Sequence, residues 1–243
     1  MKVRRFCIRA TVGFAMSVTT IAACAQSAGD NVISAGWSHA FMQTGSNPVR
    51  ITSIGGKPVD MQIPGSGVGA INGDTVELVM EHYFTDHITV AFTGGWPARV
   101  KLGGRGSLDD FGTLGDARAW APQLVLRYRF GSSENSIRPF IGVGVNYTWF
   151  TGARVTNQSF ITENYGPGGS VTSKVSSSWN PVIEAGFNYN ISRNWSVGAS
   201  VTYIPIDARV TNEGHTANGL EIVSETKLRI RPIITLLSAS YRF

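Results

Sequence analysis

The C-terminal segment constrains this chain most, because its side chains alternate between an apolar and a polar face. The apolar positions are Ile233, Leu237, Ala239, Tyr241 and Phe243, and the polar positions between them are Ser238, Ser240 and Arg242. Successive side chains of a β-strand point to opposite faces, so this pattern predicts a two-sided strand. A barrel in a bilayer needs that arrangement on every strand, because each strand contacts lipid outside and a lumen inside. The ending therefore favours an outer-membrane β-barrel.

The N-terminus has the features of a secretory signal peptide. Basic residues within the first nine positions precede an apolar stretch over residues 10–23. Small residues before the expected cut predict cleavage after Ala25, so residues 1–25 would be removed and residues 26–243 would form a single barrel domain. An alternative is a lipoprotein, because the Ile-Ala-Ala-Cys run resembles a lipoprotein box and would leave Cys24 lipidated.

Removal of this leader changes the charge and the cysteine content. The leader holds four of the 21 Lys and Arg residues and none of the 16 Asp and Glu residues, which leaves 17 basic residues and a net charge of +1. Both cysteines, Cys7 and Cys24, also fall within it. We therefore expect no basic nucleic-acid surface, no disulfide framework, no metal site and no cofactor.

The remaining chain favours strands over spanning helices. No stretch after the leader approaches the roughly 20 apolar residues that a membrane helix needs, and the mean hydropathy is +0.01. Alternation instead predicts an all-β fold, an eight-stranded antiparallel up-and-down transmembrane barrel. The expected strands cover residues 32–42, 75–84, 88–100, 120–130, 139–150, 179–191, 195–206 and 227–243.

The connections between these segments alternate in length. Three short turns are expected on the periplasmic side with both termini, and four long loops on the extracellular side, an asymmetry typical of spanning barrels. Pro97 within the third segment predicts a bulge or bend there. The competing fold is a secreted β-sandwich, whose strands also alternate but whose aromatic residues would be buried in a core.

Four motifs together resemble the OmpW family of small outer-membrane proteins. They are Phe84–Ile88, Gly95–Lys101, Arg138–Tyr147 and Ser240–Phe243. The resemblance implies a Gram-negative outer-membrane location and a largely hydrophobic lumen that passes small apolar molecules, with a lateral opening between strands as one exit. The first loop, with its three prolines, departs from the family pattern.

Barrel size limits what the lumen does. Eight strands enclose a space about wide enough for side chains or one small ligand, so a broad aqueous pore is not expected. Charged inward positions are expected to pair across the lower lumen as a plug, either structural or selective. They are Glu77, Glu81, Arg127, Arg129, Glu184 and Arg242.

Apolar inward positions nearer the long loops predict a ligand path. They are Val79, Val125, Ile204, Ile206, Ile230, Ile234 and Leu236. The resemblance adds Trp179 at the mouth, at a position similar to a family tryptophan associated with the hydrophobic channel. The alternatives are that the apolar side chains only fill the barrel and that Trp179 is an interfacial girdle residue.

These observations favour a narrow conduit for small hydrophobic molecules. The alternative is a receptor, adhesion or structural barrel that acts through its long loops. Catalysis is not expected, because the spacing of the histidines, His39, His82, His87 and His215, suggests no nucleophile and base pair. Expected partners are outer-membrane lipids, lipopolysaccharide, small apolar solutes and the barrel assembly machinery, with Tyr241 and Phe243 as the assembly signal.

Overall fold

A computed structural model describes residues 28–243 of the chain. The predicted signal peptide and the alternative lipidation at Cys24 fall outside the described residues. Within residues 28–243, no helix is both long enough and apolar enough to cross a membrane.

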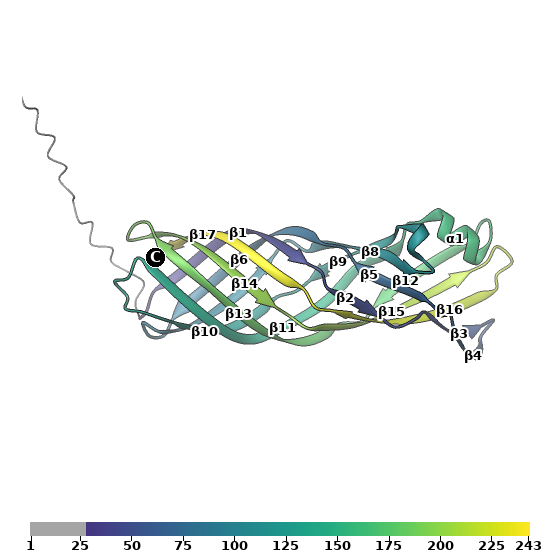
Figure 1. Ribbon diagram of the computed structural model, residues 1–243, viewed down its shortest axis with the longest axis horizontal. Helices are drawn as coiled ribbons and strands as arrows, with labels where there is room; N and C mark the ends of the chain where they lie inside the picture. Colours follow the sequence, from purple (N-terminus) through teal and green to yellow (C-terminus); the bar gives the residue numbers. More distant parts are fainter. Residues whose placement is uncertain (1–27) are drawn as a thin grey trace, which may run out of the picture.

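Eight antiparallel strands close into a barrel (Figure 1). In their order around the wall, they are β1 (Asn31–Phe41), β6 (Gly73–Tyr83), β7 (Ile88–Gly95), β10 (Gln123–Arg129), β11 (Ile137–Val155), β13 (Ser178–Asn190), β14 (Trp195–Tyr203) and β17 (Ile233–Arg242). The first and last of these strands pair with each other, with Ala35 opposite Ala239, and this pairing closes the cylinder. The predicted fold class is therefore confirmed.

The two faces of each wall strand differ in chemistry, as the alternation predicts. On β10, Leu124, Leu126 and Tyr128 are exposed on the outer face, whereas Val125 and Arg127 are buried in the lumen. The other wall strands also carry exposed large apolar residues, such as the outer residues of β6 and β11. In a bilayer this outer belt faces hydrocarbon, which stabilises it.

The long connections are largely β-structure, which corrects the prediction of loops. One group, β5 (Ser66–Ala70), β8 (Ala98–Gly106) and β9 (Thr113–Trp120), continues the wall beside the upper part of β11. A second sheet contains β12 (Ser170–Val175), β15 (Ile206–His215), β16 (Glu221–Ile230), β3 (Arg50–Ile54) and β4 (Lys57–Gln62), and β2 (Thr44–Ser46) pairs with β16. Their Ser, Thr and Gly content suggested loops, but each segment finds a neighbouring strand to pair with.

The two ends of the molecule differ (Figure 1). Short turns connect β6 to β7, β10 to β11 and β13 to β14 at one end, which we call the turn end, where the C-terminus also lies. The added strands and the helix α1 (Gln158–Tyr165) form the other end, which we call the extended end; a 3₁₀ turn, η1 (Asp109–Phe111), lies there too. The predicted asymmetry between short and long connections is thus confirmed.

Four prolines mark the level where the wall strands give way to the added strands. Pro97 separates β7 from β8, Pro122 separates β9 from β10, Pro205 separates β14 from β15, and Pro232 separates β16 from β17. Proline has no backbone N–H to donate to a strand ladder, so strand pairing stops at each of these positions. The strands predicted at 88–100, 195–206 and 227–243 are therefore each divided in two. We call this level the waist.

Candidate functional site: an apolar lumen above a charged plug

A network of buried ion pairs crosses the lumen near the turn end. Arg127 on β10 donates hydrogen bonds to both carboxylate oxygens of Glu184 on β13, each at 2.8 Å, and to Oε2 of Glu81 on β6 at 3.0 Å. Arg129 donates to both oxygens of Glu81 at 2.7 Å and to Asn188 at 2.9 Å. We call the four charged residues of this network the plug.

Aromatic rings support the plug from the same lumen. The guanidinium carbons of Arg127 and Arg129 lie 4.7 and 5.0 Å from the ring centre of Phe140, and Arg129 also lies 5.0 Å from the ring centre of Tyr83. All four charged side chains are at most 6% exposed. The plug thus balances its charges internally, with two arginines and two glutamates buried together in the lumen.

Two of the six predicted plug residues lie elsewhere. Arg242 is near the turn end, where its Nη1 donates to Asp30 at 3.1 Å. Glu77 lies above the plug, and its side chain is hydrogen-bonded to Ser38 on the neighbouring strand. The period-two pattern placed both residues on the inner face correctly, but their heights along the barrel separate them from the plug.

Above the plug the lumen holds a cavity of about 130 Å³ at the level of the waist. We call it the lower chamber. Its apolar lining includes Ile204, Ile206, Ile230, Pro232 and Ile234, and its polar lining includes Glu77, Thr93, Gln123 and Thr148. Four of the predicted ligand-path residues, the isoleucines, therefore lie together around one cavity.

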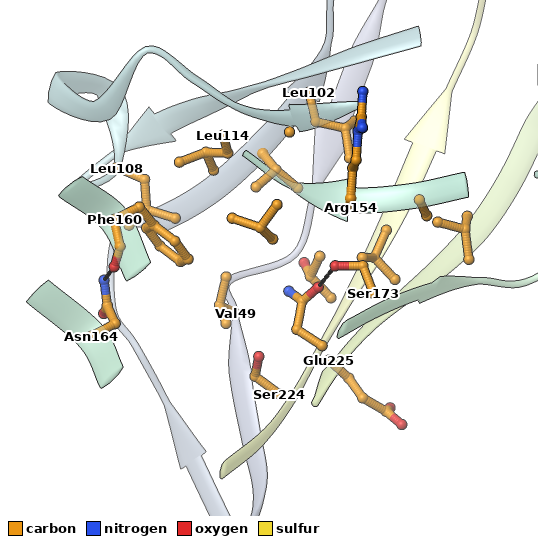
Figure 2. A pocket seen from close by; sticks show the side chains of 18 of the residues that line it. Val49, Leu102, Leu108, Leu114, Arg154, Phe160, Asn164, Ser173, Ser224 and Glu225 are labelled. Atoms are coloured by element: carbon orange, nitrogen blue, oxygen red, sulfur yellow. Dashed lines mark hydrogen bonds between the residues drawn. The ribbon is translucent and has the colours of Figure 1, made fainter. Parts of the chain in front are cut away.

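A second cavity of about 140 Å³ lies beyond the first, toward the extended end (Figure 2). We call it the upper chamber. The figure shows Leu108, Leu114 and Phe160 on one side of it and Arg154, Ser173 and Glu225 on another. Most of its lining is apolar, and it comes from strands on both sides of the barrel together with α1.

Helix α1 covers part of the upper chamber. Asn157 caps the helix by accepting a hydrogen bond from the backbone N–H of Phe160 at 2.8 Å. Tyr165 at the other end packs against Gly214 of β15, where any Cβ would collide with the tyrosine ring. Burial raises the pKa of the Tyr165 hydroxyl, and its hydrogen bond with Ser224 acts in the opposite direction. The helix is therefore attached to the second sheet by a buried side chain.

A narrow apolar constriction separates the two chambers. Along β16, Thr226 lines the upper chamber and Ile230 the lower, and Leu228 between them is 2% exposed. Ala208 of β15 lies opposite Leu228 in the strand pair and is also buried. Leu228 is the larger of these two side chains and belongs to the buried apolar core between the chambers.

Three other predicted ligand-path residues line neither chamber. Val79 and Leu236 lie lower, beside the plug, where they pack with Ala91. Val125 is fully buried in the apolar core. They face the lumen as predicted, but they lie outside both chambers.

The prediction for Trp179 is corrected by the structure. Its side chain is 73% exposed on the outer face of β13, and its ring centre lies 4.8 Å from that of Tyr147 on the neighbouring strand. Trp120 and Trp149 stack nearby on the wall with ring centres 5.8 Å apart. Trp179 thus takes the alternative role of an interfacial girdle residue, because the strand alternation points it away from the lumen.

The upper chamber contains residues that the sequence did not indicate. Val49, Ile51 and Ile63 come from the proline-containing first loop, and Phe160 and Tyr165 come from the third. A signal was present in the first loop, where apolar residues recur among the prolines. It was not decisive, because only pairing with β16 brings this segment over the barrel.

The rim of the upper chamber contains two ion pairs that share one carboxylate. Asp116 accepts a hydrogen bond from Nε of Arg154 at 2.8 Å and is also paired with Arg99. The hydrogen bond from Arg154 lowers the pKa of the Asp116 carboxyl below its ordinary value of 3.8, burial opposes this shift, and Arg99 adds to it. Both arginine side chains are largely exposed, so solvent screens these interactions.

Strand pairing around the lower chamber is interrupted at the waist. Between β7/β8 and β9/β10, pairing stops at Thr93 with Gln123 and resumes at Ala98 with Ala119. We call this interruption the first break. Between β14/β15 and β16/β17, pairing stops at Tyr203 and resumes at Ile206, and we call this the second break.

The two breaks are not equivalent. Arg231 covers the second break, since its Nη1 donates to the carbonyl oxygen of Ile206 at 3.2 Å and to Asp207 at 3.1 Å, and the adjacent Pro232 is fully buried. At the first break Gly94, Gly95, Ala98 and Ala119 are small, and all but Gly95 are half-buried, whereas the larger side chains of Trp96 and Trp120 beside them are exposed. Among the described residues, no side chain is hydrogen-bonded across this break as Arg231 is across the second.

Sequence comparison identifies the family of this barrel. A model described as the OmpW family matches residues 27–243. The chain belongs to the OmpW family. Outer membrane protein W of Salmonella typhi is 30% identical over 207 residues, which cover 84% of this chain and 87% of that protein. The resemblance drawn from the four motifs is confirmed.

A solved structure supports the same fold for this OmpW-family chain. The crystal structure of outer membrane protein OprG from Pseudomonas aeruginosa superimposes with a TM-score of 0.78 at 23% identity, covering 91% of this chain and 99% of that one. The chain is thus located in the Gram-negative outer membrane, with the turn end periplasmic and the extended end extracellular. The family consists of non-enzymatic barrels, so the chain is not an enzyme.

A more distant relative has a name that refers to the metabolism of an organic compound. The dibenzothiophene metabolism operon protein PahQ of Pseudomonas aeruginosa is 24% identical over 185 residues, which cover 75% of this chain and 77% of that protein.

Proposed function

We propose that this OmpW-family barrel is a narrow conduit that passes small hydrophobic molecules from the cell surface into the outer membrane. The solute enters the upper chamber, passes Leu228 into the lower chamber and leaves sideways through the first break. The observation that carries this proposal is the stacking of two apolar chambers directly above an ion-paired plug. Transfer of an apolar solute from water into the upper chamber is favourable in free energy. On this path the solute does not have to pass charged groups.

The plug argues against an axial exit. Moving an apolar molecule past Arg127 and Glu184 would require it to separate buried ion pairs without replacing their hydrogen bonds. Such unpaired buried charges are strongly unfavourable. A lateral exit avoids this cost, because the lower chamber opens at the wall above the plug.

The first break is the better exit of the two. Arg231 and Pro232 cover the second break, whereas no comparable side chain covers the first break, where Gly94, Gly95, Ala98 and Ala119 are small. Trp96 beside it is 80% exposed, and Trp120 flanks its other edge. These aromatic rings support a position of the break near the outer membrane interface, where a released solute would meet lipid.

The name of the relative PahQ supports an apolar aromatic solute. Dibenzothiophene is a flat, largely apolar molecule, and a lumen lined by isoleucine and leucine suits that class. Chamber volumes of about 140 and 130 Å³ favour small solutes over lipids.

Liposome uptake of a fluorescent polycyclic aromatic solute tests the conduit. Purified barrel should accelerate entry, and Ala119→Trp should remove most of the acceleration because the new ring fills the first break from the luminal side. Leu126→Trp adds the same ring on the outer face of β10 and serves as the matched control. Trp179→Ala should also leave uptake unchanged. Equal uptake with and without wild-type protein would refute the conduit.

The receptor hypothesis remains the second candidate because the β3–β4 hairpin projects from the extended end (Figure 1). Arg50 and Asp60 link its strands by an exposed ion pair, with Nε of Arg50 2.5 Å from the carboxylate. A receptor without transport predicts no solute entry in the same liposomes, together with binding to cells or matrix that is lost when residues 50–62 are deleted.

A further inference from the structure

The floor of the lower chamber is polar, although its walls are apolar. Glu77 on β6, Thr93 on β7 and Gln123 on β10 all line this cavity on its plug side. Thr93 is directly opposite Gln123 across the strand pair, and Glu77 is opposite Gly95 on the same neighbouring strand as Thr93. Three adjacent strands therefore direct polar side chains toward one region of an otherwise hydrophobic space.

Two of these side chains have buried polar atoms without partners. Among the described residues, Oγ1 of Thr93 and Oε1 of Gln123 have no hydrogen-bond partner, although the two residues are only 3% and 8% exposed. A buried polar atom that lacks a partner costs free energy, and such atoms in native structures call for an explanation. Both atoms belong to residues that line the lower chamber.

Glu77 adds a carboxyl group to this floor. Its side chain is hydrogen-bonded to Ser38, and no ion pair in the described part of the chain includes it. The nearby arginines have other partners. Arg127 donates to Glu184 and Glu81, and Arg129 donates to Glu81 and Asn188. The floor thus presents two acceptors, the Glu77 carboxyl group and the Gln123 carbonyl, beside the hydroxyl of Thr93.

We infer that the floor is a recognition site for the head group of an amphipathic solute, an apolar molecule that ends in a hydrogen-bond donor such as a hydroxyl or a primary ammonium group. The body of the solute contacts the isoleucines of the lower chamber, and its head donates to Gln123 and Glu77. A carboxylate head is disfavoured because it has no proton to donate to these acceptors. The inference rests on the proposed conduit and defines which of its solutes is held at the first break.

Methyl NMR in lipid nanodiscs tests this site with four probes of equal chain length: octane, 1-octanol, octylamine and octanoate. Shifts of the Ile206 and Ile230 methyl groups report occupancy of the chamber, and the Thr93 methyl group reports the head. We expect octanol and octylamine to bind about tenfold more tightly than octane at equal membrane concentration, and octanoate to bind no better than octane.

Three substitutions separate head recognition from chamber occupancy. Thr93→Val and Gln123→Met should remove the preference for octanol over octane, and Glu77→Gln should reduce the affinity for octylamine more than that for octanol. Thr75→Val is the matched control, because Thr75 lines the same cavity but its hydroxyl already donates to the carbonyl oxygen of Trp96 at 2.8 Å.

The outcomes distinguish this site from the conduit itself. Equal binding of octane and octanol, unchanged by Thr93→Val and Gln123→Met, would overturn the head-group site and leave the conduit standing. A failure of every probe to shift Ile206 and Ile230 would overturn both. A preference for octanoate would also contradict the inference.

Discussion

Arg127 and Glu184 form a two-point ion pair across the lumen, with Nε and Nη2 of the arginine each 2.8 Å from a different carboxylate oxygen. The two residues come from strands that are not neighbours, since β11 lies between β10 and β13. The pair therefore connects two wall strands that do not pair with each other, and it occupies the lumen between them. Its geometry is the planar, paired arrangement that arginine forms with carboxylates.

Breaking this pair should destabilise the barrel. Glu184→Ala leaves the Arg127 guanidinium with only the Glu81 carboxylate, and loss of one partner from a buried ion pair typically costs about 3 to 5 kcal/mol. Urea unfolding in detergent micelles measures the change. Glu213→Ala removes an exposed pair with Lys174 and should cost less than about 1 kcal/mol. Equal effects of the two substitutions would contradict the assignment of the plug.

Leu228→Ala should widen the passage between the chambers. Removing the buried isobutyl group leaves space at the narrowest point, so the barrel should admit larger aromatic solutes than wild type does. Liposome uptake of a size series gives the cutoff. The cost in stability should be about 2 to 5 kcal/mol, as for other buried leucines. Leu237→Ala changes a lipid-facing leucine and should leave the cutoff unchanged.

The Asp116 ion pairs should make the extracellular rim sensitive to acid. The folded-state pKa of this carboxyl is lowered below 3.8, so its contribution to stability is present above the unfolded pKa and is lost as pH falls through the folded value. Asp116→Asn should therefore be less stable than wild type at pH 7, by up to about 1 kcal/mol, and the difference should disappear in acid as the carboxyl becomes protonated in the folded state. Unfolding curves at pH 7 and across the acid range measure it, and a difference that grows in acid would disprove the pairing.

Gly36 is required where the barrel closes. A Cβ at this position would collide with the carbonyl oxygen of Leu237 on the adjacent strand and lie 2.9 Å from the Leu236 side chain. Gly36→Val should therefore slow folding or lower the yield of the heat-modifiable barrel on cold SDS gels. Gly45→Val is the control, because nothing lies within 4 Å of a Cβ there. Normal folding of Gly36→Val would show that the closing strands tolerate displacement.

Most of the barrel wall could be predicted from the sequence. Period-two alternation on segments such as 123–129 separates the lipid face from the luminal face, and it assigned Arg127, Glu184 and Ile230 to the interior correctly. The same rule, applied consistently, assigns Trp179 to the outer face. Its assignment to the ligand path came from the family resemblance and was wrong in position.

The sequence did not show at which height along the barrel axis each inward residue lies. Alternation gives the side of the sheet on which a residue lies, but the stagger between strands decides which inward residues meet. Glu77 therefore lies above the plug, and Arg242 lies below it beside Asp30. The added strands were missed for a related reason, because segments such as 50–54 form strands only when β16 supplies a partner.

The sequence by itself determined the two-sided strands, the short turns and the positions where proline prevents strand pairing, because each depends on local backbone and side-chain chemistry. Only the tertiary structure decided that Pro97, Pro122, Pro205 and Pro232 lie at one level, and that Arg231 covers one resulting break while the other has small residues at its edges. That outcome depends on the register of strands far apart in the chain, and closure of the cylinder fixes this register.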